Sequence, residues 1–252
     1  MDLKQLKENK KELIELKKAE KKFTNGINAV IGKGSSAIKG IYKNNETELD
    51  RTIVANTYYW MDNHDDVHSK SVFKKSISER ASKVFHLHDH EFKITAKVGE
   101  PIGIYEKEIA WRDLNVDKDG TTEALFMDTQ VMKEYNLLVF NAYKNNLINQ
   151  HSVGMQYDKI DLAINDEQYE EEYKVWTDNI GLLGNPERAE DKGYFWLVRE
   201  AKLIEISAVL MGSNELTPTL GETKEAAAQG TAEKEAEQSL QRTIKFYNNL
   251  KI

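Results

Sequence analysis

The chain of 252 residues contains no cysteine and three prolines. Without cysteine it can form no disulfide framework, and it cannot use a thiolate as nucleophile or metal ligand. No apolar run reaches the roughly 18 residues that a membrane-spanning helix needs, and the first residues lack the apolar stretch of a signal peptide. The formal net charge of −7 disfavours a broad nucleic-acid surface. We therefore expect a soluble intracellular protein that binds neither membrane nor nucleic acid.

Changes in composition divide the chain into three parts. Lysine and glutamate alternate from residue 2 to 22 around apolar residues at helical spacing, which predicts an exposed amphipathic helix. After Thr217 the composition changes to alanine, glutamate and glycine, ahead of a charged helix predicted from 232 to about 248. The expected parts are a charged N-terminal helix and linker (1–36), one globular domain (37–218), and a linker with a charged C-terminal helix (219–252).

Strand signals dominate the central part. β-Branched and aromatic residues predict a hairpin from 38–42 and 52–59, and apolar residues at helical spacing predict a helix from Val131 to about Asn149. Further strands are expected at 84–90, 102–111, 122–127, 150–157, 194–198 and 203–211, with one more at Tyr173–Trp176 inside an acidic excursion from 161 to 191. This mixture indicates an α+β domain.

Three of the six histidines fall in Val84–His90, where apolar and imidazole side chains alternate. Successive side chains of a strand point to opposite faces, so His86, His88 and His90 are expected to share one face. Histidine has the ordinary pKa nearest neutrality, and such a cluster indicates a proton-transfer centre or a metal site. A strand that merely tolerates histidine is the alternative without chemistry.

Two further polar residues lie in predicted strands. Ser152 shares an expected strand face with Gly154, and such a serine has room for a substrate carbonyl. Glu205 lies in a strand whose other face is apolar, where a carboxylate is costly unless it has a partner such as an imidazole. His88, Ser152 and Glu205 therefore supply an imidazole, a hydroxyl and an orienting acid, the groups that acyl transfer needs.

The segment Asp62–Asp66 combines acidic residues with His64. Its carboxylates could bind a divalent cation, because such ions prefer oxygen ligands. A solvent-exposed loop is the alternative without a ligand.

Four segments, in this order, resemble the prohead proteases of tailed bacteriophages. The first, Asp65–Ile77, looks like the segment before that family's active site, and the second, His86–Asp89 with Pro101–Gly103, is similar to its His-Asp and Pro-Ile-Gly signatures. The third, His151–Gly154, resembles its serine strand. The fourth, Glu205–Val209 with Asn214, resembles its closing Glu-Val-Ser block. The resemblance extends over about residues 37 to 218. Two extra histidines, His86 and His90, depart from the family pattern.

The resemblance implies His88 as general base and acid, Ser152 as nucleophile and Glu205 as the orienting member; the extra histidines leave His86 or His90 as substitutes for Glu205. It also implies an antiparallel β-barrel flanked by helices, as in the assemblin protease of herpesviruses, with helical charged tails. The implied protein is a serine endopeptidase without a cofactor. It would act inside the immature prohead in the host cytoplasm, on the scaffold protein, the major capsid protein and itself. The oligomeric state, a homo-oligomer included, stays open.

Two other functions are compatible with the same residues. His86, His88 and His90 could bind Zn²⁺ and leave a coordination position for water, which would make the protein a zinc-dependent hydrolase. A non-catalytic scaffold or assembly protein of the capsid could keep the fold without the chemistry. A zinc site would leave Ser152 and Glu205 unexplained.

Overall fold

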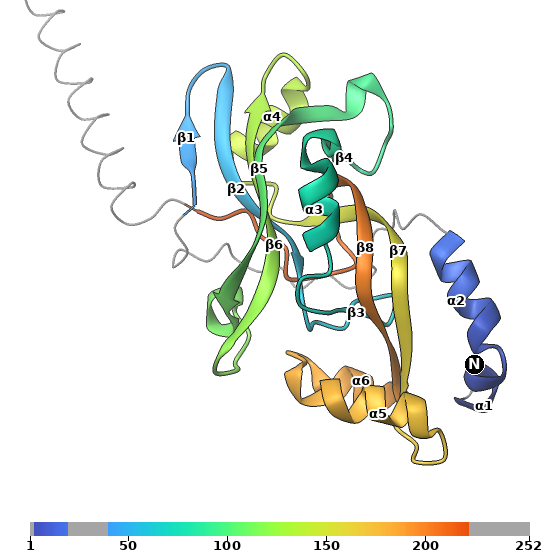
Figure 1. Ribbon diagram of the computed structural model, residues 1–252. Coiled ribbons are helices and arrows are strands. Elements are labelled where there is room, and N and C mark those ends of the chain that lie inside the picture. Colours follow the sequence, from blue (N-terminus) through green and yellow to red (C-terminus); the bar gives the residue numbers. More distant parts are fainter. Residues whose placement is uncertain (1–2, 20–39, 222–252) are drawn as a thin grey trace, which may run out of the picture.

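The computed structural model describes residues 3–19 and 40–221, which form a mixed α+β fold (Figure 1). The helices are α1 (Leu3–Glu8), α2 (Lys10–Ala19), α3 (Lys74–Arg80), α4 (Leu137–Lys144), α5 (Glu170–Asn179) and α6 (Pro186–Lys192). The strands are β1 (Tyr42–Asn44), β2 (Glu48–Thr57), β3 (Asp66–His68), β4 (Phe85–His88), β5 (Lys97–Ala110), β6 (Thr121–Met132), β7 (His151–Ile164) and β8 (Tyr194–Ala208). In this part of the chain no helix is both long and apolar enough to cross a membrane.

The eight strands form one sheet in the order β1-β2-β6-β5-β4-β8-β3, with β7 paired to β8. Most pairs are antiparallel, but β8 runs parallel to β3 and β4. In Figure 1, β7 and β8 run side by side, and α5 and α6 lie at one end of them. Strand pairing among the described residues does not close the sheet, so they show a large mixed sheet and not the expected antiparallel barrel.

The segment Asn214–Leu220 links β2 to β7, which strand pairing leaves separate. The Leu220 N–H donates to the Thr52 carbonyl at 2.9 Å, and the Val54 N–H donates to the Pro218 carbonyl at 2.9 Å. On the other side, the His151 N–H donates to Thr217 Oγ1 at 3.0 Å, and Thr217 Oγ1 donates back to the His151 carbonyl at 2.7 Å. The segment therefore satisfies backbone groups of both strands.

The N-terminal helices are docked on the domain. Leu6 is buried in the main hydrophobic cluster, with Leu3, Leu13 and Ile14 packed against that cluster. Lys7 and Lys10 both bond the buried carboxylate of Glu172, and Lys17 Nζ bonds Asp66 Oδ1 at 2.5 Å. The prediction of a helix is thus confirmed for residues 3–19. The helix covers buried acidic groups, whereas an exposed helix was expected.

The local predictions had mixed outcomes. The first hairpin is confirmed as the antiparallel pair β1–β2. The helix predicted from Val131 begins later, because β6 continues to Met132 and α4 begins at Leu137. The strand predicted at Tyr173–Trp176 is wrong, since these residues belong to α5. The predicted C-terminal helix lies outside the described residues.

Candidate active site

Strands β4, β8 and β7 carry the predicted site residues, and their register decides which side chains share a face. Ser152 of β7 lies opposite Ser207 of β8, and Gly154 lies opposite Glu205. Leu87 of β4 lies beside Ser207 in the parallel pair. Paired residues of neighbouring strands project from the same face of a sheet. We call the face that carries Ser152, Glu205 and Ser207 the serine face.

The opposite face points into the hydrophobic core, and we call it the core face. His86 lies beside Ile206, and His88 lies beside Ala208. Ile206 and Ala208 both belong to clusters of buried apolar residues. The register therefore directs the side chains of His86 and His88 away from Ser152.

A turn after β4 reverses this alternation for the third histidine. Asp89 and His90 have φ angles of 51° and 57°, in the left-handed region that few residues other than glycine adopt. The Asp89 N–H donates to the Ala208 carbonyl at 3.0 Å, and the Glu91 N–H donates to the His88 carbonyl at 3.1 Å. The strand thus ends at His88, and the turn places the His90 ring on the serine face.

On this face a buried carboxylate holds the imidazole. His90 Nδ1 lies 2.6 Å from Glu205 Oε1, and their side chains are 4% and 0% exposed. Ser207 Oγ donates to Glu205 Oε2 at 2.6 Å and accepts the backbone N–H of His90 at 3.1 Å. A buried carboxylate is costly without partners, and each oxygen of Glu205 has one. With Nδ1 on Glu205, Nε2 is the nitrogen that points away from the carboxylate.

Ser152 lies on the neighbouring strand, directly opposite Ser207. It is buried, and Cβ atoms of directly opposite residues in an antiparallel pair lie about 4.5 to 5.5 Å apart, so the side chains of Ser152 and Ser207 are neighbours on this face. The next β7 position on the same face is Gly154, which has no side chain to stand between Ser152 and the His90–Glu205 pair. A hydroxyl, an imidazole and a carboxylate therefore lie on one sheet face, and these are the group types of a serine hydrolase.

The structure does not place the His88 ring on the face of Ser152. Its Nδ1 contacts the Asp89 carboxylate at 3.0 Å, and it lines a core-face cleft of about 290 Å³ together with residues of α4. The choice of His88 as base came from the resemblance of His86–Asp89 to the His-Asp signature. His88 is paired with Ala208, so its ring projects from the core face, whereas His90 follows the turn at Asp89 and reaches the serine face. The register puts Ser152 and Glu205 on one sheet face, and the residue in contact with Glu205 there is His90, one of the two substitutes that the sequence offered for the third member.

Beneath Ser152, the core face carries a separate network of neutral side chains. His86 bonds Thr129 Oγ1 through Nδ1 at 2.8 Å and the Tyr143 hydroxyl through Nε2 at 3.2 Å. The same hydroxyl lies 2.9 Å from His151 Nε2, and His151 Nδ1 donates to the Thr217 carbonyl at 2.8 Å. Burial lowers the pKa of His86 to about 3 and that of His151 to about 4. Both rings are uncharged structural groups.

The three histidines of Val84–His90 do not converge on one point. Both nitrogens of His86 are engaged on the core face, and Nδ1 of His90 is engaged on the serine face. Across residues 3–19 and 40–221 no group of three histidine, aspartate or glutamate side chains could hold a metal ion. The three histidines proposed as zinc ligands therefore do not have the arrangement that a zinc site needs.

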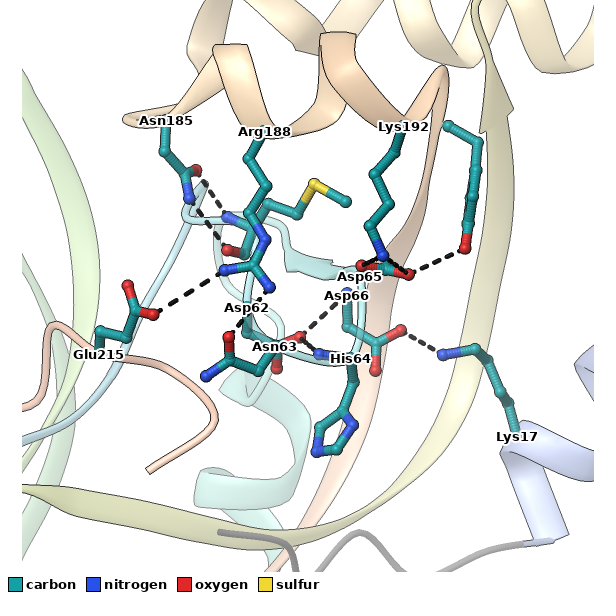
Figure 2. Close-up of polar contacts among 12 residues, drawn as sticks. Lys17, Asp62, Asn63, His64, Asp65, Asp66, Asn185, Arg188, Lys192 and Glu215 are labelled. Atoms are coloured by element: carbon teal, nitrogen blue, oxygen red, sulfur yellow. Dashed lines mark hydrogen bonds and ion pairs between the residues drawn. The ribbon is translucent and has the colours of Figure 1, made fainter. Parts of the chain in front are cut away.

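The acidic loop Asp62–Asp66 forms a second polar cluster (Figure 2). Asp62 Oδ1 accepts the backbone N–H groups of His64 and Asp66 at 2.8 and 3.0 Å. Burial and then the neighbouring Asp66 raise the pKa of Asp62 to about 7. Asp62 is thus a buried structural group, and the loop is not the solvated segment that the sequence suggested as the alternative to a cation site.

The other two carboxylates of this loop point to different cations. Asp65 binds Lys192 Nζ at 2.8 Å, and Asp66 binds Lys17 Nζ at 2.5 Å (Figure 2). The Tyr157 hydroxyl also donates to Asp66 Oδ2 at 2.7 Å. The ammonium groups of Lys192 and Lys17 balance the charges of these two carboxylates. The loop is therefore a junction between helices and sheet.

Sequence reasoning missed two members of the serine-face cluster. It placed His90 with His86 and His88 as one metal set or as a substitute third member, and it gave Ser207 no role. The spacing of Glu205 and Ser207, two residues apart in one strand, was a usable signal because such residues share a face. Nothing in the sequence marks the left-handed conformation of Asp89 and His90.

Comparisons with known proteins add no assignment: no protein-family model matches the chain, and neither the curated proteins nor the solved structures contain a significant match.

Proposed function

We propose that the protein is a serine endopeptidase with Ser152 as nucleophile, His90 as general base and acid, and Glu205 as the residue that orients His90. The observation that carries the proposal is the 2.6 Å contact between His90 Nδ1 and the buried Glu205 carboxylate, on the same sheet face as Ser152. A carboxylate in this position selects the tautomer in which Nδ1 carries the proton and Nε2 can accept one.

The chemistry follows from these positions. Ser152 Oγ attacks the carbonyl carbon of the scissile peptide, and its proton passes to His90 Nε2. Glu205 stabilises the imidazolium, which then protonates the leaving amine as the carbon–nitrogen bond breaks. Water hydrolyses the ester on Ser152 through the same base. Ser207 is a positioning residue, because it bonds both the Glu205 carboxylate and the His90 backbone.

The resemblance to prohead proteases supports a specific biological substrate. We extend the proposal to cleavage of the scaffold protein, the major capsid protein and the chain itself within an immature viral prohead. The order of the resembling segments supports this extension, and three of them contribute His90, Ser152 and Glu205 or their immediate neighbours.

The same resemblance leads us to propose the finer fold, an assemblin-like barrel. In support of it, Asn214–Leu220 bonds β2 on one side and β7 on the other, where a barrel would have to close. In this proposal the segment takes the place of direct β2–β7 pairing.

The test is cleavage of a co-expressed capsid or scaffold protein by the wild-type chain and by Ser152→Ala. We expect the variant to keep the circular dichroism spectrum and melting temperature of the wild type and to lose at least about a thousandfold of the activity. A fluorophosphonate probe should label wild type and not the variant. Undiminished cleavage by Ser152→Ala would remove the serine mechanism. Absence of both labelling and cleavage in the wild type would favour a non-catalytic scaffold.

A further inference from the structure

An apolar depression of about 250 Å³ lies next to the turn that carries His90. Its lining consists of Phe85, Leu87, Phe92, Lys93, Ile94 and Lys97. Phe85 and Phe92 are about half exposed, at 49% and 55%, and Ile94 is 96% exposed. Large side chains of this kind are usually buried, so their grouping at one place marks a binding surface.

The register joins this depression to the serine face. Phe85 lies beside Glu205 and Leu87 beside Ser207 in the parallel β4–β8 pair. Ser207 in turn lies opposite Ser152. The aromatic depression and the nucleophile are therefore on one continuous face, with the His90–Glu205 pair between them.

The distance between Ser152 and the depression matches a short length of extended peptide. Ser152 and Leu87 lie on strands separated by one intervening strand, which places their backbones about 10 Å apart at the usual strand spacing. An extended peptide covers about 3.3 to 3.6 Å per residue. A substrate whose scissile carbonyl is at Ser152 would reach the depression with a side chain two or three residues from the cleaved bond.

The charges at the rim favour an apolar occupant. Lys97 is paired with Glu100, and Lys93 Nζ lies 3.2 Å from Glu91 Oε1. These lysines are already balanced by neighbouring carboxylates, so the depression offers little additional attraction to an acidic side chain. Its walls are aromatic and aliphatic.

We propose that the depression formed by Phe85, Leu87, Phe92 and Ile94 is the specificity subsite of the protease and binds a large apolar side chain of the polypeptide substrate, two or three residues from the scissile bond. This inference rests on the proposed endopeptidase function. It adds the chemical class of the residue that the site selects.

The experiment uses the full-length chain, a mixed peptide library and mass spectrometry of the cleavage products. Wild type should enrich leucine, isoleucine, methionine or phenylalanine at one position near the cleaved bond by about tenfold, since apolar pockets discriminate by 10- to 200-fold. Phe85→Ala with Phe92→Ala should abolish that enrichment, and Phe85→Glu should shift it toward lysine and arginine. Fluorophosphonate labelling of Ser152 should persist in these variants.

The matched control is Leu138→Ala, an 82% exposed leucine that lines the core-face cleft beside His88. This variant should keep the wild-type preference. Cleavage and labelling by wild type without apolar enrichment, or with enrichment that survives the Phe85 and Phe92 substitutions, would overturn the subsite and leave the endopeptidase intact. If only the Leu138 variant lost the preference for apolar residues, the core-face cleft beside His88, and not the depression, would select the substrate side chain. A wild type that neither labels nor cleaves would overturn both proposals.

Discussion

The two faces of the sheet at the β4–β8–β7 junction use the same residue types for different purposes. On the core face, His86 and His151 are bonded at both ring nitrogens, and burial keeps them neutral. On the serine face, His90 has its Nδ1 on a carboxylate. The comparison teaches that partners and face, more than local clustering of histidine, separate structural rings from chemical ones.

The strongest test of this comparison substitutes one histidine on each face. We expect His90→Ala to lower kcat/KM at least about a thousandfold, because it removes the base. His88→Ala should keep kcat/KM within about threefold of the wild type, because its ring projects from the other face. Steady-state kinetics on one peptide substrate provide the measurement. The opposite pattern would restore His88 as the base.

A second test weakens the acid on the serine face. Glu205→Gln should lower kcat on the order of a hundredfold or more, because an amide no longer stabilises the charged imidazole. Ser207→Ala is the matched control, since it removes one hydrogen bond to the same carboxylate and should cost about tenfold. Equal activity of Glu205→Gln and wild type would show that the carboxylate does not act on the base.

Acid should lower the free energy of unfolding through the two histidines of the core face. Burial holds the pKa values of His86 and His151 at about 3 and about 4, below the ordinary 6.5. The unfolded chain therefore binds more protons, and stability present above pH 6.5 is lost as the pH falls toward 4, by up to about 1.4 kcal/mol per pH unit for each ring. Urea titrations from pH 7.5 to 4.5 measure this. NMR signals of the two rings that titrate near pH 6.5 in the folded protein would contradict it.

The smallest effect is expected for the hydroxyl that joins the core-face rings. Tyr143→Phe removes bonds to His86 and His151, and it should lower the unfolding free energy by about 1 to 3 kcal/mol. Peptidase activity of the folded fraction should be unchanged, because Tyr143 projects to neither Ser152 nor His90. Thermal unfolding and kinetics on the same sample separate the two effects. A large loss of kcat with wild-type stability would mean that the faces are coupled.

Several features of the fold followed from local sequence patterns. The β1–β2 hairpin was predicted from β-branched and aromatic residues, and the strands of Ser152 and Glu205 from alternating polarity; pairing of β7 with β8 joins the last two. Alternation alone also put Glu205 on a different face from Ile206. Short-range periodicity was sufficient because each of these segments is a regular strand.

The remaining features depend on contacts that no local pattern encodes. The end of β4 at His88 and the left-handed turn at Asp89 are set by a bond to the Ala208 carbonyl, far along the chain. The same limitation applies to Tyr173–Trp176, where apolar spacing suits a strand and tertiary packing selects a helix. The base of the candidate site could not be identified without this long-range information.

For the proposed peptidase, the bonds between Thr217 and His151 set a minimum length of chain. His151 precedes Ser152 directly, and both its N–H and its carbonyl are held by Thr217 Oγ1. A truncated protein that stops after β8, at residue 211, would retain His90, Ser152 and Glu205 yet leave the backbone next to the nucleophile unsupported. Such a fragment should be a poor enzyme, and extending it to Leu220 should recover turnover.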